Sequence, residues 1–152
     1  MSTLLTNKTL SVERQDALRA AIELFYFAYR AFTAQADRHL AEIGLGRVHH
    51  RILYFVGRNP DLAVNALIDI LGVSKQAINA PLRQLIEMEM VSSTTAAHDR
   101  RVRQLRLTAA GSALEQSLSA EQMQTMETAF AQVGVEGEAV WRRIMATLAE
   151  RP

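Results

Sequence analysis

The sequence predicts a mainly α-helical protein in which a helix-turn-helix is followed by a small β-hairpin and is flanked by N- and C-terminal helices. Apolar residues recur with a helical period over residues 11–39, 75–86 and 109–131. In residues 102–108 apolar and polar residues alternate, which is the period of a strand. A chain of 152 residues is long enough to bury one core, so we expect a single domain over residues 1–152.

The first predicted helix begins at Ser11, which is followed three residues later by Arg14 and so forms only half of a capping box. A second helix is expected from Arg47 to Val56. It contains His49 and His50, which point about 100° apart on a helix and so make no ready metal pair. We expect His50 to pack in the core and His49 to make a polar contact at a helix junction.

The helix-turn-helix is predicted from a short helix that ends at Leu71-Gly72 and a second helix that begins after Ser74. Serine is a preferred N-cap because its oxygen accepts a free backbone N–H. Pro81 lies inside the second helix, and we expect a bend near residues 77–81 because proline removes a backbone hydrogen bond. At 100° per residue, one arc of this helix of about 100° is polar and contains no acidic residue. Its members are Lys75, Gln76, Asn79 and Arg83.

The hairpin is predicted from two strand-like runs, Val91–Thr95 and Val102–Thr108. Arg103, Leu105 and Leu107 share one side of the second run, and the leucines are expected to face inward. The loop between the runs carries Asp99, Arg100 and Arg101 at its tip. Asp99 could hold one guanidinium extended by a charge-assisted hydrogen bond.

Helices with apolar stripes are expected at both ends of the chain, in residues 11–43 and 109–150. The C-terminal pair is interrupted near residues 134–137. These stripes could complete the core of a monomer or form a helical dimerisation region, and we favour the dimer because symmetry lets two helix-turn-helix units act together. The stripe residues are Leu18, Ile22, Phe25, Tyr29 and Phe32 in the first helix, and Val140, Ile144 and Leu148 in the last.

Duplex DNA is the partner that suits these features. A helix fits the major groove, and an arginine on a thin loop can enter the minor groove. The net charge of +1 is unevenly distributed, because residues 74–108 hold six Lys and Arg against three Asp and Glu, whereas residues 109–152 hold three against six. A polar row can also be a simple solvated face. The expected DNA contacts are Ser74, Lys75, Gln76, Asn79, Arg83, Asp99, Arg100 and Arg101.

The chain resembles the MarR (multiple-antibiotic-resistance regulator) family of winged-helix regulators. The residues that carry the resemblance are the helix-turn-helix of Leu62–Val91, the Asp99-x-Arg101 loop and the run Leu107-Thr108-Ala109-Ala110-Gly111. The resemblance implies a winged helix-turn-helix module over residues 45–108, a homodimer that binds operator DNA, and often release by a small ligand. It also implies that Arg101 enters the minor groove. The loop departs from the family pattern in having Val102, not glycine, directly after the arginines.

Enzymatic function is not predicted, because the chain has no Gly-rich phosphate loop, no cysteine and no apparent Ser-His-Asp grouping. We therefore expect no cofactor and no metal. Residues 1–12 lack a signal-peptide pattern, and no stretch of about 20 apolar residues could cross a membrane. These features favour a cytoplasmic protein without a membrane partner.

The sequence therefore predicts a homodimeric, sequence-specific transcriptional regulator that binds an inverted-repeat operator. Of the two kinds of regulator, we favour a repressor over an activator. The alternatives are a winged helix that binds proteins without specific DNA binding, and a DNA binder with no effector. A small aromatic or apolar effector would bind a cleft between the dimerisation helices and the DNA module. The residues expected to line that cleft are Phe25, Tyr29, His49 and Tyr54.

Overall fold

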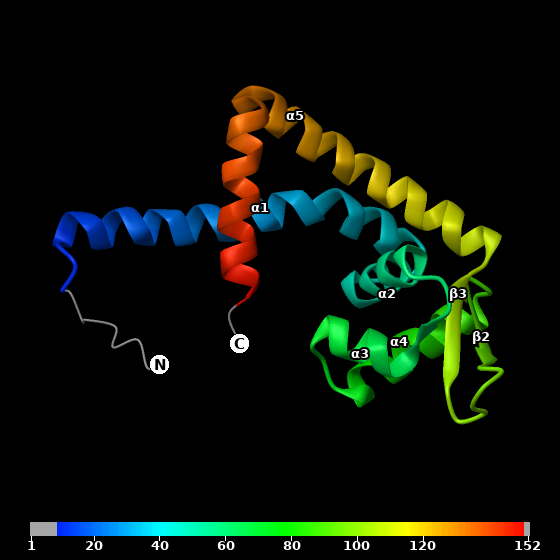
Figure 1. Cartoon of the computed structure of the whole chain (residues 1–152). Coiled ribbons are helices and arrows are strands. Elements are labelled where there is room, and N and C mark those ends of the chain that lie inside the picture. The colour runs from blue at the N-terminus through cyan, green and yellow to red at the C-terminus, as the bar shows by residue number, and fades with distance from the viewer. Residues whose placement is uncertain (1–8, 151–152) are drawn as a thin grey trace. The chain divides into compact units, whose positions relative to one another are not determined.

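A computed structural model describes residues 9–150 of the chain, so the two ends of the predicted domain, residues 1–8 and 151–152, lie outside the described part (Figure 1). The predicted fold class is confirmed, because five helices accompany a small antiparallel sheet within residues 9–150. The chain forms two compact units, which meet in sequence between Gln35 and Ala36. The elements are α1 (Val12–Glu42), α2 (Arg47–Arg58), β1 (Leu62–Ala63), α3 (Val64–Leu71), α4 (Lys75–Glu87), β2 (Val91–Thr95), β3 (Arg103–Leu107) and α5 (Ala109–Ala149).

The core of the second unit joins the end of α1 to α2, α3, α4, the sheet and the first half of α5. Burial of each large aliphatic side chain stabilises the fold by roughly 1.5–3 kcal/mol. This core fixes the helix-turn-helix and the hairpin on one rigid body. Its fully buried leucines and isoleucines are Leu40, Ile52, Leu53, Leu67, Ile78, Leu85, Leu105 and Leu118.

The boundaries of the helix-turn-helix lie where the sequence predicts them. Helix α3 ends at Leu71, and its C-cap Gly72 has a left-handed φ of 63°, which favours glycine. Ser74 caps α4, and its Oγ accepts a hydrogen bond from the Ala77 N–H at 3.1 Å. Helix α4 continues through Pro81 to Glu87, and the bend expected near residues 77–81 stays a prediction.

The hairpin of β2 and β3 is confirmed, and the structure adds a third strand in the order β1-β3-β2. Strand β1 has only two residues, of which Leu62 pairs with Leu105. Two residues are too few to show the alternation of apolar and polar side chains that predicts a strand from the sequence. Asp61, just before β1, has a φ of 65° and accepts two hydrogen bonds from Arg106, at 2.5 and 2.6 Å. These hydrogen bonds from the Arg106 guanidinium lower the pKa of the Asp61 carboxyl. The exposed pair connects the residue before β1 to β3.

Helix α5 changes direction at Gly134, whose φ of 75° is not helical. The predicted interruption near residues 134–137 is therefore confirmed. The Phe130 and Trp141 rings meet edge to face across this break, with centroids 5.1 Å apart. Several apolar side chains beyond Phe130 remain exposed, namely Val133, Val135, Val140, Ile144 and Leu148. No helix among residues 9–150 is both long and apolar enough to cross a membrane.

Gly111, in the first turn of α5, packs against the backbone of Met90, the residue before β2. Thr108 caps α5 by accepting a hydrogen bond from the Gly111 N–H at 3.1 Å, and its own N–H donates to the Met90 carbonyl at 3.0 Å. A Cβ on Gly111 would overlap that Met90 carbonyl oxygen. Backbone leaves little room to move, which explains why glycine follows Thr108 at this spacing.

We expect Gly111→Ala to lower the free energy of unfolding by about 1–3 kcal/mol, the usual cost of overpacking. Gly57→Ala is the matched control, because its nearest neighbour is the end of the flexible Leu107 side chain. Alanine there also gains up to about 1 kcal/mol of helix propensity. Urea denaturation of both variants measures the difference, and equal stabilities would contradict the close approach at Met90.

Candidate nucleic-acid interface

Helix α4 presents one polar face and one buried face, as its sequence predicts. Ile78, Leu82 and Leu85 are buried against the core. The four members of the polar arc, Lys75, Gln76, Asn79 and Arg83, are all exposed. Because the core holds the buried face, the polar arc has a defined direction, and Figure 1 shows α4 beside α3 and the β2–β3 hairpin.

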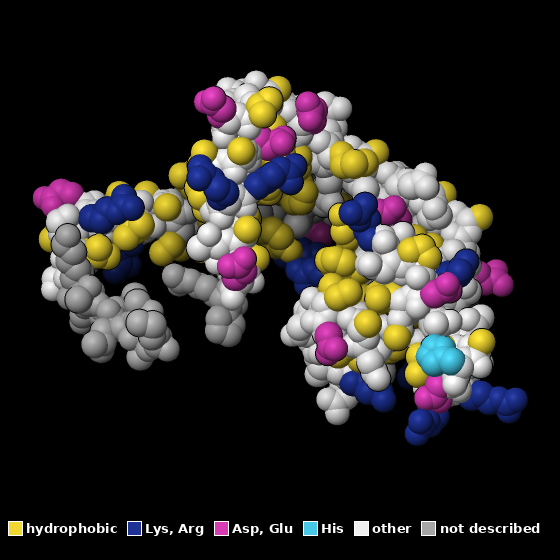
Figure 2. Space-filling model, in the orientation of Figure 1, with side chains coloured by type: hydrophobic (Ala, Val, Ile, Leu, Met, Phe, Trp, Pro, Cys, Tyr) yellow, Lys and Arg dark blue, Asp and Glu magenta, His cyan; other side chains and the backbone are white. Residues whose placement is uncertain are grey.

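The tip of the β2–β3 hairpin carries two arginines, Arg100 and Arg101, and Asp99 holds Arg101 in place by hydrogen bonds. The Asp99 carboxylate accepts the Arg101 backbone N–H at 2.9 Å and the Arg101 Nε and Nη2 at 3.2 Å each. These hydrogen bonds lower the pKa of the Asp99 carboxyl, so it is ionised at neutral pH. The Arg101 side chain is nonetheless 91% exposed. Figure 2 shows Lys and Arg side chains projecting at this tip.

The hairpin tip closes without a glycine. The Ala96 N–H donates to the Val102 carbonyl at 2.8 Å, and the Val102 N–H donates to the Asp99 carbonyl at 3.1 Å. Among the described non-glycine residues only Asp61 and Glu89 have a positive φ. Val102 therefore replaces the family's glycine at no backbone cost, and Asp99 closes the turn by accepting the N–H two residues ahead.

An open groove of about 510 Å³ lies between α4 and the hairpin. Four of the eight predicted contact residues line it: Lys75, Asn79, Arg83 and Arg101. The other four, Ser74, Gln76, Asp99 and Arg100, do not line this groove. The structure thus brings together cations and an amide from two elements that are separate in sequence.

The groove also holds polar residues that the sequence analysis did not select, among them Arg103 and Asn65. Arg103 Nε donates to the Ser93 Oγ at 2.9 Å, which directs the guanidinium along the hairpin. Arg103 lies on the same side of β3 as the buried Leu105. It is exposed because that side of the hairpin extends beyond the core, where it borders the groove.

The four residues predicted to line an effector cleft belong to different units. Phe25 and Tyr29 lie on α1 in the first unit and are 55% and 45% exposed. Tyr54 and His49 lie on α2 in the second unit; Tyr54 is 37% exposed and His49 is half-buried. The effector site stays a prediction.

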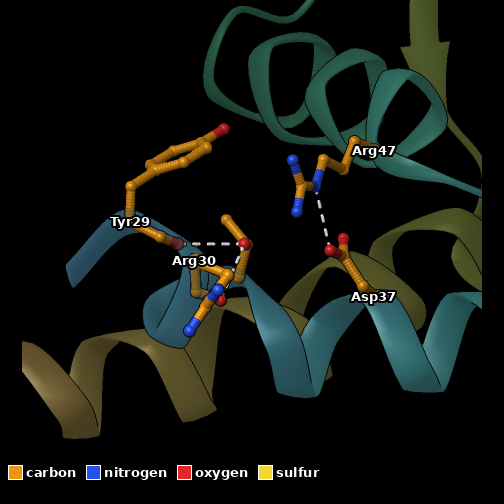
Figure 3. A network of polar contacts seen from close by, with 5 residues as sticks. Tyr29, Arg30, Asp37 and Arg47 are labelled. Carbon is orange, nitrogen blue, oxygen red and sulfur yellow. Dashed lines mark hydrogen bonds and ion pairs between the residues drawn. The ribbon is translucent and has the colours of Figure 1, made fainter. Parts of the chain in front are cut away.

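Polar contacts fix the junction between α1 and α2 within the second unit. Arg47 Nε pairs with the Asp37 carboxylate at 2.9 Å (Figure 3). His49 Nδ1 accepts the Gly46 N–H at 2.9 Å, so the predicted polar contact of His49 at a helix junction is present. His50 is half-buried rather than fully packed, and burial lowers its pKa.

In the first unit, the Thr33 hydroxyl donates to the Tyr29 and Arg30 carbonyls (Figure 3).

Comparisons with known proteins agree with this geometry. The sequence profile of the MarR family matches residues 43–102. The chain is 40% identical over 141 residues to the HTH-type transcriptional regulator PetP of Rhodobacter capsulatus, covering 93% of this chain and 85% of that protein.

Solved structures share the fold at low sequence identity. Streptococcus pneumoniae FabT in complex with DNA is 16% identical, with a TM-score of 0.77 over 88% of this chain and 95% of that one. The S. aureus MepR–DNA complex is 18% identical, with a TM-score of 0.68 over 85% of this chain and 96% of that one.

Proposed function

Because this chain belongs to the MarR family of helix-turn-helix transcriptional regulators, we propose that it works as a homodimeric repressor that binds an inverted-repeat operator. The observation that carries the proposal is the groove between α4 and the hairpin. Cations from both elements border it, and α4 turns its acid-free arc outward. A helix that fits the major groove, with a loop beside it that can reach the minor groove, is an arrangement suited to duplex DNA.

The contact residues take different roles in this proposal. Gln76, Asn79 and Arg83 contact base edges, because an amide suits adenine and a guanidinium suits guanine. Ser74 and Lys75, at the start of α4, hold phosphates. In the hairpin, Arg101 enters the minor groove, Asp99 orients it and Arg100 contacts phosphate. Arg103 adds a further cation at the border of the groove.

The direct test is binding of duplex DNA as a function of salt. Each phosphate neutralised by Lys or Arg contributes about −0.9 to the slope of log K against log salt. We expect a steep slope, and an affinity for the preferred duplex at least about 10³-fold above that for unrelated DNA. A chain that bound peptides but showed neither property would be a protein-interaction module instead.

Exposed apolar surface on α1 supports the homodimer. Ile22, Leu24, Phe25, Tyr26 and Phe27 are 49–69% exposed, and Figure 2 shows hydrophobic side chains along this helix. At 100° per residue, the three charged side chains of residues 17–33 fall within one arc of about 40°. A helix that is apolar over most of its circumference needs to be covered. The helices of a second copy would cover it.

The proposal includes a small-molecule effector and the cellular location of the protein. A small aromatic or apolar molecule that favours a dimer with wrongly spaced hairpins would release the operator, and about 1–3 kcal/mol of coupling is typical. Phe25, Tyr29, His49 and Tyr54 are the residues proposed to contact it. The proposed location is the cytoplasm, which suits a regulator that binds operator DNA.

Asn79→Ala and Lys75→Ala are expected to weaken DNA binding in different ways. Loss of one bidentate base contact costs about 1–3 kcal/mol of discrimination, so Asn79→Ala should relax preference at one base pair in each half-site. Lys75→Ala should weaken all sequences about equally and reduce the salt slope by about one unit for each phosphate lost. Titrations of single-base operator variants measure both effects. A uniform loss in both variants would contradict the assigned roles.

A further inference from the structure

A hydrogen-bonded chain joins α4 to the turn between α1 and α2. His49 Nδ1 accepts the Gly46 N–H at 2.9 Å, so the neutral ring carries its proton on Nε2. That Nε2–H donates to the Gln84 Oε1 at 2.8 Å, and the Gln84 Nε2 donates to the Gly44 carbonyl at 3.4 Å. One amide of α4 is therefore held both by the first turn of α2 and by the backbone that precedes it.

Gln84 lies in the half of α4 that follows Pro81. Pro81, about one turn before Gln84, has no N–H, so the Ala77 carbonyl lacks its usual helical partner. On the helix, Gln84 points about 80–100° from Gln76 and Arg83, away from the polar arc. Its hydrogen bonds therefore restrain rotation of α4 about its axis without occupying the groove.

We propose that His49 and Gln84 are positioning residues for DNA recognition, which lock α4 to the turn at residues 43–46 and so fix the direction of its base-contacting side chains. The inference rests on the proposed function, in which α4 contacts bases. The turn follows directly on α1, so a displacement of the end of α1 would reach Asn79 and Arg83 through the same two side chains. Base contacts tolerate small errors poorly, whereas phosphate contacts are made by long, flexible cations.

Two substitutions of His49 separate this role from capping of α2. An asparagine amide places its Oδ1 near the position of Nδ1, so His49→Asn keeps an acceptor for the Gly46 N–H and loses the link to Gln84. A glutamine amide reaches the position of Nε2, so His49→Gln keeps the link and loses the cap. Gln84→Met removes the link from the other side at similar volume.

The experiment measures affinity for the tightest duplex selected from a random pool and for an unrelated duplex of equal length, together with thermal unfolding of each variant. We expect His49→Asn and Gln84→Met each to lower the specific affinity about 10-fold and to leave the unrelated duplex within about 2-fold, the loss being one base contact per half-site. His49→Gln should stay within about 3-fold of wild type. The double variant His49→Asn/Gln84→Met should lose no more than Gln84→Met alone, because both single changes break the same link.

Three outcomes would overturn the inference. Unchanged specific affinity in both His49→Asn and Gln84→Met, beside a wild type that binds specifically, would overturn it and leave the proposed function intact. Equal losses in His49→Asn and His49→Gln would assign the ring to folding of α2. A wild type without specific binding would overturn the proposed function and this inference with it.

Discussion

Phe25→Glu is expected to convert the protein from dimers to monomers and to lower operator affinity at least about 100-fold. Phe25 is 55% exposed within the single chain and lies inside the apolar arc of α1. In the proposed dimer a second copy covers that arc, and an unpaired carboxylate buried there costs several kcal/mol. A monomer then presents one α4 to a two-half-site operator, and the second half-site no longer contributes to binding.

The matched control is Glu23→Gln, on the narrow charged arc of the same helix. It should remain dimeric and should bind the operator like wild type. Size-exclusion chromatography with light scattering resolves the 16.9 kDa chain from its dimer, and a DNA titration follows on the same samples. A Phe25→Glu variant that stayed dimeric with full affinity would exclude this face of α1 from the interface.

Asp99→Ala is expected to weaken operator binding about 10-fold although it removes a negative charge beside the DNA. Its carboxylate holds both the backbone N–H and the guanidinium of Arg101. Loss of these contacts frees a long side chain that then has to be ordered on binding. Arg101→Ala should cost more than Arg100→Ala, and the extra cost should shrink where the flanking sequence is G·C-rich, because a narrow A·T minor groove attracts arginine most strongly.

Asp99→Asn refines this test, because asparagine can still accept the Arg101 N–H and close the turn. It should fall between wild type and Asp99→Ala if both the turn and the charged pair contribute. Titrations at fixed salt measure the series. Tighter binding by Asp99→Ala than by wild type would show that the hairpin tip acts as a simple cationic patch.

Local signals in the sequence predict most of the DNA module. Ser74 and Gly72 act through their own backbone neighbourhood, so the helix boundaries they mark could be placed from the sequence. The alternation around Leu105 likewise predicts β3, because one of its sides faces the core. Asp99 and Arg101 are two residues apart, and their contact needs no knowledge of the fold.

Features that depend on tertiary packing could not be predicted in this way. Strand β1 exists because Leu62 meets Leu105, and two residues carry no period. Arg103 borders the groove because the hairpin extends past the core, which alternation alone does not reveal. Gln84 and His49 are 35 positions apart in the chain and meet only when α4 packs on α2. The close approach at Gly111 likewise requires the position of the Met90 carbonyl.

The central claim is that two copies of α4 and of the hairpin contact one operator. Selection of bound duplexes from a random pool by the full-length protein tests it most directly. We expect an inverted repeat whose half-site centres lie about one DNA turn apart, roughly 34–36 Å, or a multiple of that. An enriched sequence without two-fold symmetry, or a pool with no enrichment at all, would contradict it.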